Sequence, residues 1–280
     1  MKIIPYKFTE LKFYDFSLVG HSIAGEETVI MAPEMDLAFD IGRCPIEALT
    51  VGNILLSHGH TDHSAGLPFY FVHRNMQIKK IGTALVPWEL VDPLEEMMRI
   101  WEKIDNNVHP HKIIGMKNEE EYPLNKRLIV RAFTTNHNLP SLGFALMEMR
   151  HKLIEDFCGR PESELCILKA QGIPITKVEE IPLIAYLGDT MIDDFISLPY
   201  VANAKVLILE CTFFAEDHLE RSRKYKHTHV SDLPEFLSKM NNKYIVITHV
   251  TKRIKIPEAK TILENYLPHN VLERVSFLMG

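Results

Sequence analysis

Six short apolar runs, each followed by a residue that can bind a metal or move a proton, set the strongest limit on the fold. The runs lie at 37–39, 54–56, 128–130, 183–187, 206–209 and 244–247, and the residues that follow them are Asp40, His58, His137, Asp189, Glu210 and His249. Runs of this length rich in Val, Ile and Leu predict strands that are buried on both faces. Strands that present polar groups at their C-terminal ends predict a site along one rim of a sheet.

Helical segments separate these runs. Residues 87–103 are helical in composition, although Pro93 predicts a break or bend within the segment. Residues 233–240 predict a second helix, with Ser231 and Asp232 as its N-cap, and residues 257–266 predict a third. Sheets covered by helices predict an α/β layered sandwich. Because no repeat or Pro-, Gly- or Ser-rich linker interrupts the pattern, residues 1–280 predict a single domain.

Composition narrows the class of protein. A hydrophobic content of 46% with 24% charged residues is ordinary for a soluble enzyme, and the net charge of −6 argues against blanket nucleic-acid binding. The four cysteines form no Cys-x-x-Cys pair, which disfavours a zinc ribbon. The amino terminus has no apolar leader, and no apolar run approaches the ~18 residues of a membrane span. These features predict a cytoplasmic protein without a membrane partner.

The segment 57–63 (SHGHTDH) carries the strongest chemical signal. Imidazole and carboxylate groups are usual ligands of zinc. The three histidines and the aspartate of this segment can converge only from a tight loop, and Gly59 permits such a turn. His58 and His60 can then bind one ion, while Asp62 and His63 face a second. The alternative is an incidental histidine-rich loop, which is disfavoured because further ligand-type residues follow the other predicted strands.

Four further residues extend this site, and each has a structural alternative. His137 alone indicates a hydrogen-bonded histidine, but the upstream motif favours a ligand. Asp189 could cap a helix, yet its two carboxylate oxygens can bridge two cations. His249 could be a satisfied histidine at a strand end. Asp40 could orient a ligand histidine from behind, or it could simply begin a turn.

These residues resemble the metallo-β-lactamase superfamily, whose motif is His-x-His-x-Asp-His with a later His, a bridging Asp and a final His. The segments AFDIGRCP, GHTDHSAGLP, LGDT, ECTF, KHTHVS and ITHVTKR resemble one branch, ribonuclease Z, the tRNA 3′-end processing endonuclease, nearest its short plant-type forms. The resemblance covers nearly the whole chain from about Gly20. It implies a four-layer αββα sandwich, two zinc ions per chain and a homodimer. Manganese or iron would suit the same donors.

The resemblance also implies a role for each site residue. One zinc would be bound by His58, His60 and His137, and the other by Asp62, His63 and His249, with Asp189 as the bridge. Glu210 and His227 would handle the leaving-group proton, so that Asp62, Glu210 and His227 are the catalytic candidates. His229 is a rival of His227 for this role.

The chemistry of phosphodiester hydrolysis agrees with these roles. Two metals ~3.5–4 Å apart can generate a bridging hydroxide at neutral pH and hold the in-line geometry. A histidine can protonate the departing oxygen if a carboxylate fixes its tautomer. The sequence therefore predicts a zinc-dependent phosphodiesterase that removes the 3′ trailer from precursor tRNA. The alternative without a catalytic role is that Glu210 is a surface acid and His227 is a solvated histidine.

Two cationic segments flank the predicted site. The run 221–226 precedes His227, and Lys252 and Arg253 follow His249. Such cations could contact a nucleic-acid backbone, or they could form a solvated loop. The candidate phosphate contacts are Arg223, Lys224, Lys226 and Arg253.

The interval between His137 and Asp189 differs from the ribonuclease Z pattern. Many members of that branch hold tRNA with a flexible arm placed here, whereas this interval is short, mixed in charge and without an obvious basic tip. The sequence therefore predicts no such arm, so that another surface holds tRNA or the substrate differs. The alternative substrates are a small phosphodiester, a cyclic nucleotide, a thioester or a lactone. A third hypothesis is a metal-stabilised binding protein without turnover.

Overall fold

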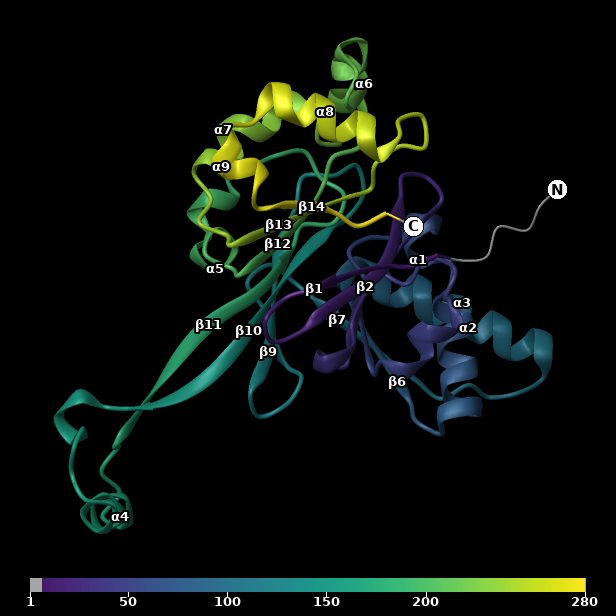
Figure 1. Ribbon diagram of the computed structural model, residues 1–280. Helices are drawn as coiled ribbons and strands as arrows, with labels where there is room; N and C mark the ends of the chain where they lie inside the picture. Colours follow the sequence, from purple (N-terminus) through teal and green to yellow (C-terminus); the bar gives the residue numbers. More distant parts are fainter. Residues whose placement is uncertain (1–6, 280) are drawn as a thin grey trace.

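The computed structural model describes residues 7–279 and contains two seven-stranded sheets packed face to face (Figure 1). The first sheet holds, in spatial order, β1 (Thr9–Lys12), β2 (Ser17–Ile23), β3 (Glu27–Ala32), β4 (Leu37–Phe39), β5 (Asn53–Leu55), β6 (Gly82–Pro87) and β7 (His111–Met116). The second holds β14 (Val275–Phe277), β13 (Tyr244–Thr248), β12 (Val206–Glu210), β11 (Thr176–Tyr186), β10 (Leu142–Leu153), β9 (Leu128–Thr134) and β8 (Glu121–Pro123). Each of the six predicted apolar runs overlaps a strand.

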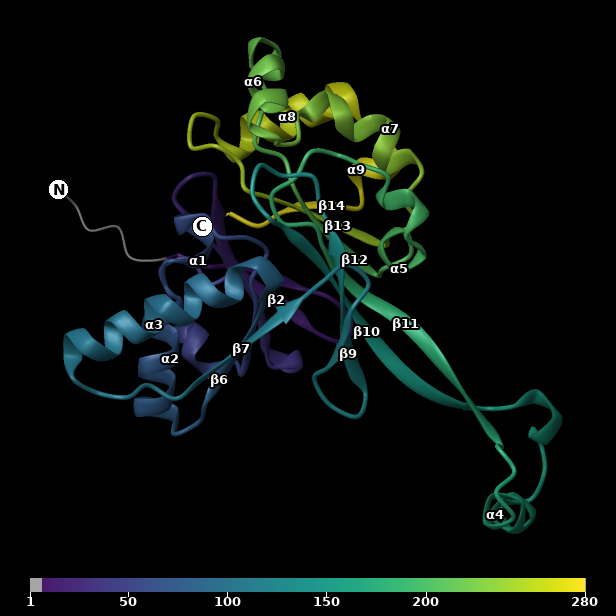
Figure 2. The same ribbon diagram turned by 180° about the vertical axis from the view of Figure 1, so that it is seen from behind.

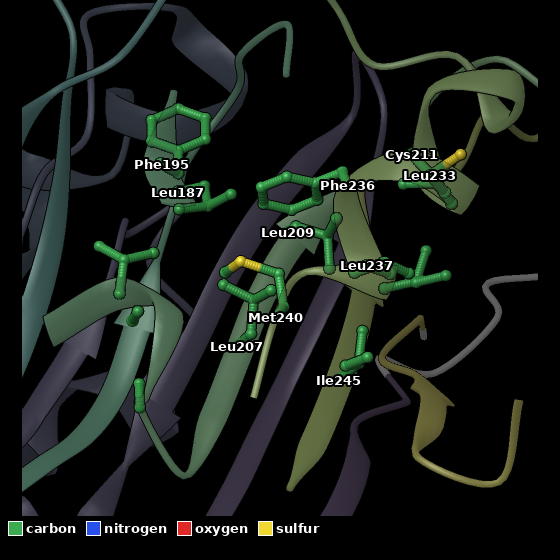
Figure 3. Close-up of a cluster of buried hydrophobic side chains, with 14 of the residues drawn as sticks. Leu187, Phe195, Leu207, Leu209, Cys211, Leu233, Phe236, Leu237, Met240 and Ile245 are labelled. Atoms are coloured by element: carbon green, nitrogen blue, oxygen red, sulfur yellow. The ribbon is translucent and has the colours of Figure 1, made fainter. Parts of the chain in front are cut away.

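Helices cover the outer face of each sheet, which confirms the predicted αββα sandwich. The first sheet is covered by α2 (Leu67–His73) and α3 (Val91–Asp105), and the second by α5 (Pro199–Ala202), α7 (Leu233–Ser238), α8 (Ile256–Tyr266) and α9 (His269–Leu272). A further apolar cluster fills the space between the sheets. The side chains of β12 alternate between two of these clusters. Leu207 and Leu209 pack against the outer helices, as Figure 3 shows, while Val206 and Ile208 pack between the sheets.

The strand directions bring the predicted site residues to one rim. Strands β4 to β7 are parallel, and so are β11 to β14. Strand β9 is antiparallel to β10, and β10 is antiparallel to β11, so β9 runs in the direction of β11. The carboxyl ends of these strands therefore point the same way within each sheet, and the ligand-type residues follow those ends.

Three local predictions need correction. Residues 87–103 form a short 3₁₀ turn and then α3, and Pro93 lies in the first turn of α3. A proline there forfeits no intrahelical hydrogen bond, so the predicted break is wrong. The second predicted helix begins at Leu233, but the Asp232 carboxylate accepts from the His229 N–H and does not cap it. Gly59, expected to permit the tight loop, has no positive φ, and an added Cβ would meet Leu90 only at 3.5 Å, so the turn does not depend on this glycine.

A long hairpin projects from the second sheet (Figures 1 and 2). It consists of the outer halves of β10 and β11 with α4 (Glu162–Ala170) at the far end, and we call residues 149–180 the arm. The prediction that the interval between His137 and Asp189 lacks an arm is therefore wrong. Both strands of the arm are largely exposed, and none of the residues of α4 is buried.

No helix among residues 7–279 is long and apolar enough to cross a membrane. Residues 1–6, which contributed to the prediction of a cytoplasmic location, lie outside the described part of the chain.

Candidate metal centre

Three imidazoles from two loops form the first group of donors. His58 and His60 follow β5, and His137 follows β9. The Nδ1 atom of His60 lies 2.9 Å from Nε2 of His58 and 3.3 Å from Nε2 of His137. Burial is the largest cause that lowers the pKa of each of the three rings, which favours their neutral forms. Three neutral nitrogens that face one another at this distance suit a shared cation.

A carboxylate and two imidazoles form the second group. Asp62 and His63 lie on α1 (Thr61–Ser64), a single helical turn that follows the 57–60 loop, and His249 follows β13. The Nε2 atoms of His63 and His249 are 3.4 Å apart, and Asp62 Oδ2 lies 3.7 Å and 3.6 Å from them. Burial would raise the pKa of Asp62, but a hydrogen bond from His249 and the charge of His63 hold it below its usual value.

Asp189 stands between the two groups. Its Oδ2 atom lies 3.8 Å from His58 Nε2, 3.4 Å from His63 Nε2 and 3.3 Å from His249 Nε2. Burial opposes its ionisation, yet the charges of His249 and His63 lower the pKa of Asp189 well below its usual value. All seven residues predicted as ligands thus converge, in His/Asp clusters compatible with a dinuclear metal site.

Buried hydrogen bonds orient the donors from behind. The Nδ1–H of His63 donates to Asp40 Oδ2 at 2.7 Å, which leaves Nε2 facing Asp189. Asp40 is fully buried and also accepts from the Ser57 hydroxyl at 2.9 Å and the Tyr186 hydroxyl at 2.5 Å. A carboxylate that fixes the ring of a ligand histidine is a common feature of metal sites. This geometry matches the orienting role predicted for Asp40.

Three segments of the site contain a residue in the left-handed backbone conformation. Asp40 and His249 have φ values of 54° and 56°, and Gly188, just before Asp189, has a φ of 63°. Non-glycine residues adopt this conformation at a cost of about 1–3 kcal/mol, and such strain clusters at functional sites. A Cβ atom on Gly188 would also lie only 2.9 Å from Ser57 Cβ, so that position requires glycine.

Glu210 and His227 form a pair beside the donors. His227 Nδ1 lies 2.7 Å from Glu210 Oε1, and the His227 ring stacks on that of His249 with centroids 5.4 Å apart. Burial lowers the pKa of His227, but the charge and hydrogen bond of Glu210 outweigh it and raise that pKa to about 9. The rival His229 has both ring nitrogens within 3.0 Å of Ser231 Oγ and the Ala215 carbonyl oxygen, away from Glu210.

Several residues of the site were not found from the sequence. Thr212 Oγ1 lies 2.9 Å from His249 Nδ1 and 2.5 Å from Glu210 Oε2, and Tyr186 contacts Asp40 from β11. Threonine and tyrosine are common in strands, so their hydroxyls give no signal in the sequence. Tyr186 at the end of β11 and Thr212 just after β12 reach the donors only in the folded chain.

A cavity of about 590 Å³ lies over the site, and the predicted phosphate contacts divide around it. Arg253 lines the cavity. Arg223 instead donates to both carboxylate oxygens of Asp232, at 2.7 Å and 2.5 Å. Lys226 Nζ donates to the His137 carbonyl at 3.3 Å, and Lys224 Nζ lies over the Tyr225 ring.

The comparisons with known proteins agree with this geometry. The model of the Beta-lactamase superfamily domain matches residues 42–250, so the chain belongs to that superfamily. It is 34% identical over 247 residues to tRNase Z TRZ1 of Arabidopsis thaliana, a match that covers 87% of this chain and 88% of that protein. Within the superfamily, the chain therefore belongs to the tRNase Z family. This confirms the predicted enzyme class, a metal-dependent hydrolase and endoribonuclease.

Solved structures share the fold. The metallo-beta-lactamase fold protein YhfI of Bacillus subtilis superposes with a TM-score of 0.61 and 13% identity, covering 93% of this chain and 94% of that chain. The short form of human tRNase Z superposes with a TM-score of 0.54 and 19% identity, covering 85% of this chain and 87% of that chain.

Proposed function

We propose that this chain is a zinc-dependent phosphodiesterase that removes the 3′ trailer from precursor tRNA. The observation that carries the proposal is the Glu210–His227 pair beside the two donor groups. A hydrolase that only had to polarise a small ester would not need a histidine whose ring is fixed by a buried carboxylate at the edge of its metal centre. The family relatives, which are named tRNase Z, support the choice of substrate.

The donor set supports the predicted metal content. His58, His60 and His137 would hold one ion, Asp62, His63 and His249 the other, and Asp189 would contact both. Nitrogen and carboxylate donors without cysteine suit zinc, and also manganese or iron. When bound, the two ions would ionise a water molecule near neutral pH and neutralise phosphate charge.

The chain's own residues then perform the proton transfers. Asp62 is oriented by the Gly25 N–H, which donates to its Oδ2 at 3.0 Å, and its carboxylate borders the cavity where it can orient the attacking water. His227 donates its Nδ1–H to Glu210, so its Nε2–H is free to protonate the departing oxygen. Glu210 is held in turn by the Thr190 N–H at 2.9 Å. General acid catalysis of this kind contributes typically about 10²–10⁴-fold.

The test is cleavage of a precursor tRNA by purified, zinc-loaded protein, with His227→Ala and Glu210→Ala as variants. We expect a cut after the discriminator base, and a loss of that activity in both variants. Intact RNA together with hydrolysis of a simple phosphodiester would overturn the tRNA assignment. Hydrolysis of a thioester or lactone that survives both substitutions would favour the alternative hydrolase.

Three further expectations belong to this proposal. The apolar cluster shared by both sheets supports one domain over residues 1–280. The homodimer and the cytoplasmic location rest on the resemblance and on composition, and sedimentation velocity and fractionation of cells would test them.

A further inference from the structure

The outer wall of the cavity is built around Phe213. This residue follows β12, and its backbone is fixed because its carbonyl accepts from the Val230 N–H at 2.9 Å. Its ring centroid lies 6.0 Å from that of His227 and 5.7 Å from that of His218. Phe213 is largely buried, with 7% of its surface exposed, so it acts as a rigid support rather than as a free surface.

Arg221 extends from α6 (Leu219–Tyr225) over this support. Its guanidinium carbon lies 5.7 Å from the Phe213 ring centroid and 5.9 Å from that of Tyr225, and the residue is exposed and lines the cavity. Arg221 makes no ion pair among residues 7–279. Two neighbouring cations differ, because Arg223 is paired with Asp232 and Lys252 with Glu26, while Arg253 lines the cavity together with Arg221. Arg221 therefore keeps its planar set of donors available to an anion.

The order of these groups gives the cavity a direction. His249 belongs to the donor groups, His227 stacks on it, and the Phe213 ring meets His227 in an edge-on contact, with Arg221 next to Phe213. The Nδ1 of His227 is committed to Glu210, so Nε2 faces the departing oxygen. The RNA strand that carries this oxygen therefore extends from the reacting phosphate past His227, in the direction of Phe213 and Arg221.

We propose that Arg221 binds the next backbone phosphate on the leaving-group side of the scissile bond, supported by Phe213 and bordered by His218. This inference rests on the proposed function, since a substrate with one phosphate would not reach the subsite. Arg221 is thus a binding residue that orients the leaving strand, and Phe213 is a positioning residue that holds its guanidinium. A planar guanidinium matches phosphate oxygens in a two-pronged contact, which a lysine cannot reproduce.

The experiment compares Arg221→Gln with Arg221→Lys in the full-length, zinc-loaded protein. Lys260→Gln on α8 is the matched control, because it removes one exposed positive charge that does not line the cavity. The substrates are a precursor tRNA and bis(p-nitrophenyl) phosphate, which carries one phosphate only. Elemental analysis verifies equal zinc content in each variant.

We expect Arg221→Gln to lower kcat/KM on the tRNA about tenfold, the effect of ~1.4 kcal/mol, with a much smaller loss on the simple diester. Arg221→Lys should give a kcat/KM on the tRNA between those of the unmodified protein and Arg221→Gln, because lysine keeps the positive charge but lacks the planar guanidinium. Anisotropy of labelled tRNA on zinc-free protein should show weaker binding, with a salt slope reduced by about one.

Two results would overturn the subsite while leaving the proposed function intact. One is an Arg221→Gln variant that cleaves tRNA as well as Lys260→Gln does. The other is an equal loss on both substrates, which would indicate a disturbed metal centre. If the unmodified protein left tRNA intact while hydrolysing the diester, the proposed function would fall, and the subsite with it.

Discussion

The hairpin of β10 and β11 joins two regions with opposite environments. At its inner end, residues 142–148 and 183–186 are buried, and the chain continues from Tyr186 to Asp189. At its outer end, in the arm, the same two strands are largely exposed. One antiparallel ladder runs through both halves, from Phe144↔Tyr186 to Leu153↔Thr176, with a register shift at Leu146/Met147. The inner end is held by side-chain packing and buried hydrogen bonds, whereas the arm depends on its backbone ladder.

The largest effect is expected at the inner end, from Asp189→Ala. This change removes the oxygen that faces both donor groups, and we expect a loss of activity of about 10³-fold or more, because several kcal/mol of charge stabilisation is at stake. Metal content measured by elemental analysis should fall as well. Glu179→Ala, in the arm portion of the same strand, should retain both properties. Comparable losses from the two substitutions would contradict the contrast.

A smaller loss is expected from Asp40→Asn, which acts through His63. The amide keeps the shape of the carboxylate but cannot accept all the hydrogen bonds that converge on it. Metal affinity should drop about 10–100-fold, the usual effect of changing a group that orients a ligand. Competition with a chelator would measure it. An unchanged affinity would show that His63 holds its orientation without Asp40.

At the outer end, we expect removal of residues 154–175, replaced by an Asn-Gly turn, to separate binding from chemistry. Cleavage of precursor tRNA should lose roughly tenfold in kcat/KM, corresponding to ~1.4 kcal/mol of binding. Hydrolysis of a small diester and the melting temperature should change far less, because α4 has no buried residue. A collapse of the melting temperature would mean that the arm stabilises the core.

The smallest effect is expected where the two regions meet, at Glu148. This buried carboxylate pairs with Arg150 and Arg127. The hydrogen bond from Arg150 lowers the pKa of Glu148, burial opposes the shift, and Arg127 adds to it. A lowered folded-state pKa gives stability above the unfolded-state value, and this stability is lost as the pH falls through the folded-state value. Glu148→Gln should therefore lower the melting temperature by about 2 °C at pH 7, and by less at pH 3. Equal differences at both pH values would exclude the ion pairs as the cause.

The same contrast explains what the sequence could reveal. The inner half of β11 contains a continuous apolar run, so the strand, its burial and the position of Asp189 were all predictable. The arm has polar residues on both faces, with Arg150 and Glu179 on one face and His151 and Glu180 on the other, and it shows neither an apolar run nor a clean alternation. A strand exposed on both sides is specified by backbone pairing, which leaves little trace in the sequence.

The ligand-type residues of the site were predictable from the sequence, whereas the roles of the cations beside it were not. Ligand-type residues after buried strands are recognisable because their chemistry is rare at such positions. The cations of residues 221–226 were not separable, because sequence cannot show that Arg223 pairs with Asp232 while Arg221 faces the cavity. The side of α6 on which each arginine lies decides which of the two faces the cavity, and this side is known only from the folded structure.

The hydroxyl of Thr212 connects the candidate metal centre to the Glu210–His227 pair. This hydroxyl donates its proton to Glu210, so it accepts a hydrogen bond from the Nδ1–H of His249. Glu210 also accepts from His227, so a single buried hydroxyl connects the imidazole of His249 to the carboxylate that orients His227. A substitution at Thr212 would therefore disturb both ends of the site at once.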